Sequence, residues 1–273
     1  MIVRAHPFGT LVFDRDAIVR AALRAYVEVS LANVDPRTRL QFPACSQPSW
    51  KGDLHRGAFF NGDGCGNEDV VAWTETGVVG LAHELGFGPV EQLGLSLDAV
   101  TGGPEDVRAA VPNLPTELEA AFLMAAGMLE VTGRHGETLA GVGFWLRGDQ
   151  VGGTLFDDPT PEGAYRLVAW GTLREGRLPL LCDPDTVAVA AELDRTTAAP
   201  IQSLVDALAA RAVIGPTELT TDELATLLPT PPDAGRVLTA QRRLQKVGIA
   251  WPGSPEIPGA PARSDNPFLP QAG

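Results

Sequence analysis

The spacing of apolar residues in the first part of the chain is helical after Asp14 and has no clear period over residues 35–56. After Asp14, apolar side chains recur at near-helical spacing, so Arg15 to about Asn33 is predicted to form a helix with Asp14 as its N-cap. The preceding residues TLVF are predicted to form a short strand. Residues 35–56 are rich in proline and are predicted to be irregular.

Short apolar runs separated by turn residues occupy the middle of the chain. The runs VVAW and VVGLAH flank TETG, which predicts a β-hairpin with Glu75 and Thr76 in the turn and Gly77 free to take a positive φ. GAFF precedes them as a further strand, and NGDGCGNED lets the chain reverse between GAFF and VVAW. The segments LAGVGFWL and VGGTLFDD predict a second hairpin that turns at Gly148 and Asp149.

Helical spacing returns on both sides of this second hairpin. Thr116 and Glu119 form a capping-box pattern ahead of a helix that is expected to reach about Val131. The C-terminal third contains four further candidate helices, namely DPDTVAVAAEL, PIQSLVDALAARAV, the stretch capped by Thr220 and Glu223, and GRVLTAQRRLQKVGI.

These elements predict an α+β protein with a mostly antiparallel sheet and packed helices. The expected organisation is an α+β domain over residues 1–182, a helical C-terminal extension over residues 183–250, and a flexible tail over residues 251–273. The tail is rich in proline and glycine and contains few residues that could be buried in a core.

The net charge of −13 is concentrated in one part of the chain. Residues 57–130 carry twelve acidic side chains and a single basic one, Arg108. Such a band is either a solvated face that keeps the protein soluble or a docking surface for a basic partner. It argues against general nucleic-acid binding, because phosphate contacts need clustered lysine and arginine.

Composition and cysteine content favour a cytoplasmic protein. The three cysteines, Cys45, Cys65 and Cys182, are widely spaced and odd in number, which argues against a disulfide framework. The N-terminus lacks the pattern of a signal peptide, and no apolar run is long enough for a membrane span. No motif indicates a cofactor.

The loop NGDGCGNED, residues 61–69, has the composition of a metal-binding loop but not the spacing. An EF-hand that starts at Asn61 would need oxygen ligands where Cys65 and Ala72 stand. A looser calcium site that uses Asp63, Asn67, Glu68 and Asp69 is one alternative, and a plain turn is the other. Whether the chain binds a metal is left open.

His83 and Glu84 offer a second candidate for chemistry. The zinc motif H-E-x-x-H fails because residue 87 is phenylalanine. A dispersed acid/base or metal site near His83 that also uses Glu84, Asp63 and Asp69 is still compatible with the sequence, so enzymatic activity is left undecided.

Residues 218–250 resemble helix-turn-helix or winged-helix modules. A capped helix is followed by a break and by a longer helix that carries Arg236, Arg242, Arg243 and Lys246 and no acidic residue. The break TPPDAG is longer and richer in proline than the usual tight turn. The alternative is a helical cap whose basic face pairs with the acidic band.

Residues 57–84 resemble the core of SUKH-type bacterial immunity proteins, in which a glycine-rich, Asp/Asn-containing loop leads into a β-hairpin that ends in a His–acid pair. The corresponding segments are NGDGCGNED, VVAW, TETG and VVGLAHE. The resemblance implies an α+β scaffold that binds and blocks a toxin without chemistry of its own.

The leading prediction is therefore a non-enzymatic protein that binds a basic protein partner through residues 57–106. The acidic residues expected to contact this partner are Asp63, Glu68, Asp69, Glu75, Glu84 and Glu91.

Overall fold

The computed structural model describes residues 2–6, 9–32, 34, 48–62, 68–83, 88–156, 199–227 and 233–254. The chain forms two compact units, the first made of Met1–Ala22 and Ala44–Pro179 and the second of Leu23–Pro43 and Leu180–Gly273. The chain passes between the units three times, first within helix α1 (Arg15–Ala32), where Asp14 Oδ1 caps Ala17 N as predicted. The predicted boundaries after residues 182 and 250 stay predictions.

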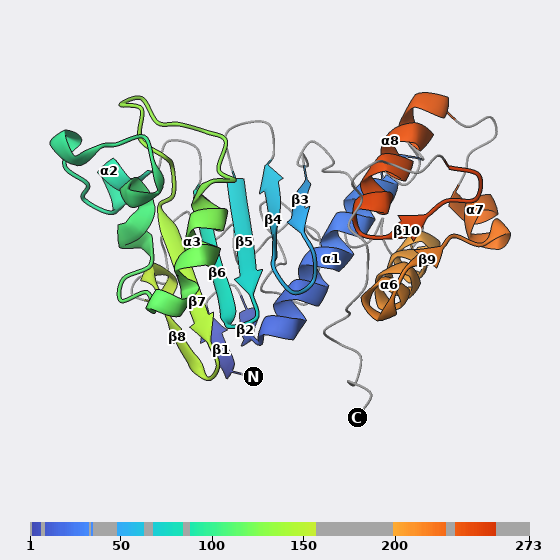
Figure 1. Cartoon of the computed structure of the whole chain (residues 1–273), viewed down its shortest axis with the longest axis horizontal. Helices are drawn as coiled ribbons and strands as arrows, with labels where there is room; N and C mark the ends of the chain where they lie inside the picture. The colour runs from blue at the N-terminus through green and yellow to red at the C-terminus, as the bar shows by residue number, and fades with distance from the viewer. Residues whose placement is uncertain are drawn as a thin grey trace. The chain divides into compact units, whose positions relative to one another are not determined.

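The first unit is built on an antiparallel sheet of six strands, which confirms the predicted α+β class (Figure 1). The order of the strands in the sheet is their order in the sequence. They are β3 (Ser49–Gly52), β4 (Gly57–Gly62), β5 (Glu68–Thr74), β6 (Gly77–His83), β7 (Val142–Arg147) and β8 (Gln150–Gly152). Both predicted hairpins, β5–β6 and β7–β8, are present. Strand β3 was missed because its proline-rich surroundings hide a four-residue edge strand.

The turn between β5 and β6 was predicted correctly, but the reason given for Gly77 was wrong. Gly77 is not among the glycines with a positive φ. A Cβ at this position would lie 2.0 Å from the carbonyl oxygen of Leu146 on β7. Glycine is therefore required by the close approach of a neighbouring strand.

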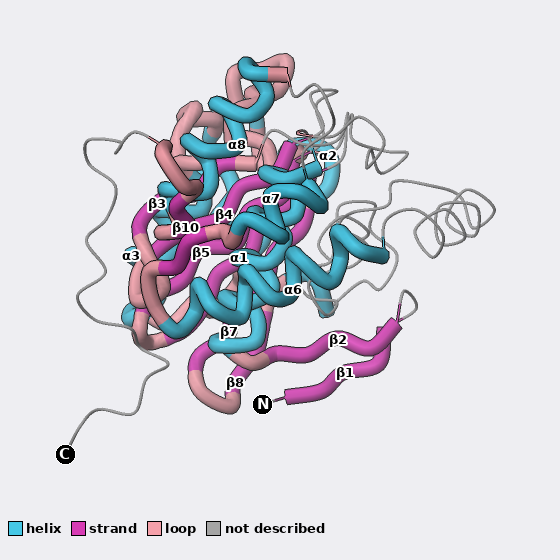
Figure 2. The backbone as a smooth tube through the Cα atoms, turned by 90° about the vertical axis from the view of Figure 1, so that its right-hand side faces the viewer, coloured by secondary structure: helices cyan, strands magenta, loops and turns pink. Residues whose placement is uncertain are grey.

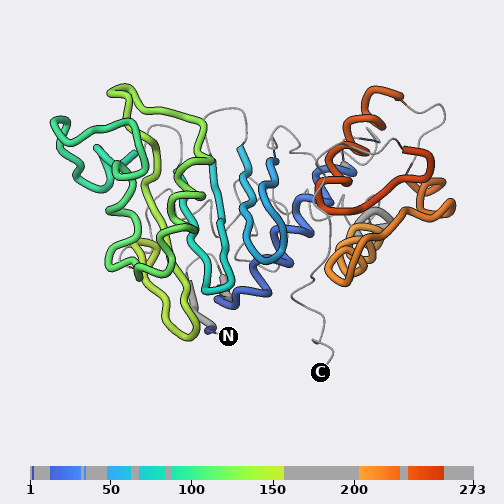
Figure 3. Tube along the Cα trace, viewed as in Figure 1, coloured from blue at the N-terminus to red at the C-terminus, as the bar shows by residue number. Residues whose placement is uncertain are grey.

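The connection between β6 and β7 crosses one face of the sheet, and its course can be followed in Figure 3. It contains helices α2 (Pro89–Gln92) and α3 (Glu119–Ala126) and the 3-10 turns η3 (Leu97–Ala99), η4 (Pro104–Ala110) and η5 (Thr116–Leu118). The predicted capping box of Thr116 and Glu119 is wrong, because Thr116 lies in η5 and the Glu119 carboxylate binds Arg108 at 2.7 Å.

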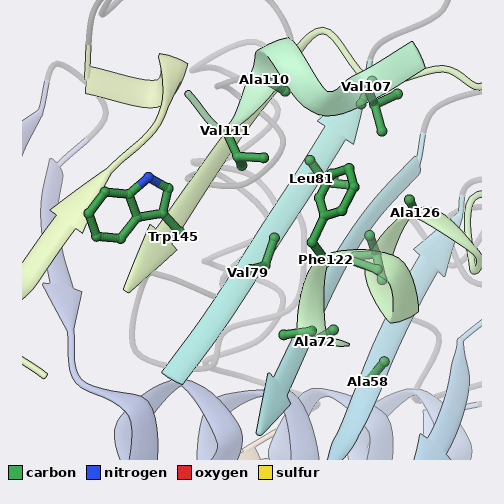
Figure 4. Close-up of a cluster of buried hydrophobic side chains, with 14 of the residues drawn as sticks. Ala58, Ala72, Val79, Leu81, Val107, Ala110, Val111, Phe122, Ala126 and Trp145 are labelled. Carbon is green, nitrogen blue, oxygen red and sulfur yellow. The ribbon is translucent and has the colours of Figure 1, made fainter. Parts of the chain in front are cut away.

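The core of the first unit lies between this connection and the sheet (Figure 4). Alternate residues of each strand face it, because successive side chains of a strand point to opposite faces. Phe122 of α3, fully buried, packs here with Leu81 of β6 and Trp145 of β7. The Trp145 indole also donates a hydrogen bond to the Pro112 carbonyl at 3.0 Å.

A separate two-stranded ribbon, β1 (Ile2–His6) and β2 (Gly9–Phe13), precedes α1 (Figure 2). The sequence predicted only the second strand. The Phe13 ring at its end packs against Phe144, with 5.7 Å between ring centroids, and against Phe156 of the turn η6 (Thr154–Phe156) at 5.2 Å. These contacts join the ribbon to β7.

The second unit contains α6 (Ala199–Ile214), β9 (Thr217–Glu218), α7 (Thr221–Leu227), α8 (Ala234–Lys246) and β10 (Ile249–Ala250). Strands β9 and β10 are parallel. The predicted capping box is confirmed, since Glu223 N donates to Thr220 Oγ1 and Thr220 N donates to Glu223 Oε2. The candidate helix DPDTVAVAAEL and the tail beyond Ser254 lie outside the described residues.

Within the described part of the chain, no helix combines the length and apolar character needed to cross a lipid bilayer.

Candidate functional site

The six acidic residues expected to dock a partner do not form one exposed surface among the described residues. Glu68 and Asp69 are buried in β5, at 5% and 0% exposure. Glu75 and Glu91 are exposed, whereas Asp63 and Glu84 lie outside the described residues. The expectation that Glu68 and Asp69 contact a partner at the surface is corrected by their burial.

Glu68 holds the chain that follows α3 against the sheet. Its Oε2 accepts the backbone N–H of Glu130 at 2.9 Å and that of Val131 at 3.3 Å. In the strand register it lies directly opposite His83, which is also fully buried. A side-chain oxygen that satisfies two backbone donors is a structural contact, because a buried N–H without an acceptor is costly.

Asp69 lies on the other face of the sheet, because it follows Glu68 along the same strand. Its Oδ1 accepts a hydrogen bond from Asn61 Nδ2 at 3.4 Å, and both side chains are buried. The dispersed site proposed from the sequence needed His83 and Asp69 to converge. The register instead places His83 on the face of Glu68, away from Asp69.

Asp106 is a further acidic residue of the band that does not lie at the surface. It is 1% exposed and accepts hydrogen bonds from Thr101, Gly102 and Thr138. Within the described residues, no group of three or more His, Cys, Asp or Glu side chains is arranged to hold a metal ion.

Several other acids of the same band are paired with arginines. Arg108 contacts Glu105 at 2.6 Å and Glu119 at 2.7 Å, and its guanidinium lies 4.0 Å from the centre of the Phe122 ring. Hydrogen bonds to Glu119 and Glu105 raise the pKa of Arg108, and the bond from Arg108 lowers the pKa of Glu119. Arg147 similarly binds Glu117 at 2.6 Å.

The second unit separates its charges by element. The described residues of this unit carry as many acidic as basic side chains, but α8 carries four basic residues and no acidic one. Its N-cap is Asp233, whose side chain accepts from Gly235 N and Arg236 N at 2.9 and 3.1 Å. Such capping stabilises the first turn of the helix.

The basic residues of α8 share one side of the helix. At 3.6 residues per turn, the positions from Arg236 to Lys246 that carry them fall within about 120° of the circumference. This sector, called the basic face below, consists of Gly235, Arg236, Thr239, Arg242, Arg243 and Lys246. The adjoining side is buried through Ala240 and Leu244, which fixes the orientation of the helix in the unit.

The basic face is largely open to solvent. Arg242 and Lys246 are exposed, whereas Arg236 and Arg243 are half-buried. Burial raises the pKa of Tyr26 on α1 to about 12. The positive charge of Arg243 lowers the pKa of this phenol, so the Arg243 guanidinium lies near Tyr26.

Glu223 and Asp206, which lie elsewhere in the second unit, are paired with other arginines. Arg211 binds Glu223 through two hydrogen bonds of 2.8 and 2.9 Å, and this contact lowers the pKa of Glu223. Arg24 binds Asp206 at 2.7 Å.

On α8 itself only Arg236 is close to a carboxylate, that of Asp233, at 3.6 Å. Among the described residues, no carboxylate lies within ion-pair distance of Arg242, Arg243 or Lys246.

The sequence named the four cations of the basic face but missed two residues that shape it. Thr239 was not considered because it is neutral, although its spacing from Arg236 and Arg243 places it between them on a helix. Tyr26 is far away in the sequence and no local pattern could associate it with Arg243.

The chain was compared with models of known protein families, with curated proteins and with solved structures, and none of the three comparisons gave a match.

Proposed function

We propose that the protein binds duplex DNA through the basic face of α8. The observation that supports this most directly is the segregation of charge, because α8 alone carries four cations and no acid in a unit whose described residues have balanced charge. The sequence-based expectation against general nucleic-acid binding rested on the acidic band of residues 57–130, which belongs to the first unit. Clustered arginine and lysine on one helix face of the second unit are the electrostatic requirement for contacts with phosphates.

A duplex fits this surface better than a single strand does. Proteins that bind single strands stack the bases on exposed aromatic side chains. The aromatic residues in the described part of the second unit are Tyr26 and Trp251, which are 1% and 4% exposed. A helix of 13 residues is about 20 Å long, and the major groove of B-form DNA admits such a helix.

A protein partner fits the basic face less well. Protein interfaces are usually centred on buried aromatic or aliphatic anchors. The basic face contains glycine, threonine and four cations, and no apolar side chain. Cations near the end of a helix also stabilise the helix itself, so the test must separate binding from folding.

The experiment is a fluorescence anisotropy titration of the full chain against a labelled duplex of about 30 base pairs at about 50 mM NaCl. Wild type is expected to bind, and the double variant Arg242→Glu/Lys246→Glu is expected to bind at least about tenfold more weakly. The matched control is Lys51→Glu/Arg56→Glu, which makes the same change of net charge at two exposed positions of the first unit. Equal weakening by the two double variants would refute the proposal.

Docking of a basic protein and kinship with SUKH-type immunity proteins stay predictions. Of the docking residues that the structure describes, Glu75 is the most exposed, with 79% of its side chain open to solvent. Charge reversal at Glu75 is therefore the change that tests this alternative, by pull-down at low and at high salt.

A further inference from the structure

The side chains at the N-terminal end of α8 are poorly suited to reading bases. In helix-turn-helix proteins, residues at the N-terminal end of the recognition helix contact base edges. Here the first two positions are Ala234 and Gly235, which carry no hydrogen-bonding side chain, and the third is Arg236, whose guanidinium lies 3.6 Å from the carboxylate of Asp233. They follow Asp233, a carboxylate that caps the helix and would face phosphate with like charge.

The neutral polar side chains of α8 either form hydrogen bonds within the protein or lie outside the basic face. The Thr239 hydroxyl donates to the Gly235 carbonyl at 2.9 Å. Gln245 Nε2 donates to Ser254 Oγ at 3.0 Å. Gln241 and Gln245 both fall outside the basic face by the spacing of the helix. Specific reading of a base usually requires such a group, or an arginine held in a fixed geometry, at the base edge.

Three of the four cations of the basic face are placed at the other end of the helix. Arg242, Arg243 and Lys246 belong to its last turn and a half, and no described carboxylate holds them in position. Lysine contacts phosphate as a point charge and carries no geometric information about a base.

We infer that α8 binds DNA through phosphates alone, so that affinity is nearly independent of base sequence; this inference rests on the proposed function. Three or four phosphate contacts set the salt dependence. The logarithm of the association constant falls with the logarithm of salt concentration with a slope of about −3, which weakens binding roughly 60-fold between about 50 and 200 mM salt.

The test is a selection by the full chain from a pool of random duplexes of about 30 base pairs, followed by sequencing and by a salt titration of the retained pool. The expected result is a retained pool with no enriched motif and a slope of about −3. Enrichment of a motif that binds more than about 30-fold tighter than the starting pool would overturn the inference and leave DNA binding intact. Failure to retain any duplex would instead refute the proposed function itself.

Discussion

The carboxylate of Asp106 accepts the backbone N–H of Thr138, thirty-two positions along the chain, at 3.0 Å. The same carboxylate accepts the backbone N–H and the hydroxyl of Thr101 and the backbone N–H of Gly102 at 2.7–2.9 Å. Asp106 thus ties together two loops on either side of α3 in the connection between β6 and β7.

Asp106→Asn is expected to lower the free energy of unfolding by about 2–3 kcal/mol. An amide NH2 cannot accept a hydrogen bond, so at least one buried backbone N–H loses its acceptor in either orientation of the asparagine side chain. Urea denaturation measures the effect, and Asp98→Asn, at an exposed position of η3, is the control. Equal stability of the two variants would show that the Asp106 hydrogen bonds do not stabilise the fold.

Stability is also expected to depend on pH through this carboxyl. Burial alone would raise the pKa of Asp106, but the hydrogen bonds from the Thr101 hydroxyl and from the three backbone N–H groups outweigh it and lower the pKa below its ordinary value of 3.8. As the pH falls below 3.8, the unfolded state therefore binds a proton at Asp106 before the folded state does. The stabilisation is fully present above about pH 4 to 5 and is lost as the pH falls through the folded-state pKa.

The measurement is the difference in free energy of unfolding between wild type and Asp106→Asn across this range. The difference should be constant near neutral pH and should shrink below about pH 4. A difference that stays constant down to about pH 3 would contradict a lowered pKa for this residue.

The local pattern of apolar, capping and turn residues predicted most of the described elements, because the signal for each lies within a few neighbouring residues. The helix after Asp14, the two hairpins and the capping box of Thr220 and Glu223 all depend on neighbours in sequence, and the structure confirms them. The capping box at Thr116 failed because Glu119 has a stronger partner, Arg108, eleven positions away. Such a contact exists only after folding.

Gly77→Ala is expected to destabilise the first unit by about 1–3 kcal/mol through overpacking, since the new methyl group would meet the Leu146 carbonyl oxygen of β7. Gly103→Ala is the control, because its φ is −130° and the nearest atom to an added Cβ is at 3.4 Å. Thermal unfolding of both variants distinguishes crowding from a general cost of replacing glycine. Equal melting temperatures would contradict crowding at Gly77.

Asp233→Ser is expected to strengthen DNA binding about twofold, because serine keeps the N-cap while removing the carboxylate beside Arg236. Asp233→Ala removes the N-cap as well as the carboxylate, and should also lower the free energy of unfolding by about 1 kcal/mol. Anisotropy titrations and thermal unfolding separate the two effects. Unchanged or weaker binding by a stably folded Asp233→Ser would argue against phosphate contact near this end of α8.

The candidate sites illustrate why charge counts along a sequence mislead. Glu68, Asp69 and Asp106 contribute to the acidic band in the sequence, yet all three are buried. Their positions depend on strand register and on loops that meet only in the folded chain. The basic face of α8 was identifiable because four cations at helical spacing depend on one continuous segment.

The most direct test of the central claim uses the two lysines of the chain, Lys51 in the first unit and Lys246 on the basic face, which are both exposed. Each is acetylated with an amine-reactive reagent in the absence and presence of saturating duplex DNA, and the rates are followed by mass spectrometry. Binding through α8 predicts that duplex slows the reaction of Lys246 several-fold and leaves Lys51 unchanged. Equal rates at Lys246 with and without bound duplex, or protection of Lys51 instead, would contradict the assignment of α8 as the DNA-binding surface.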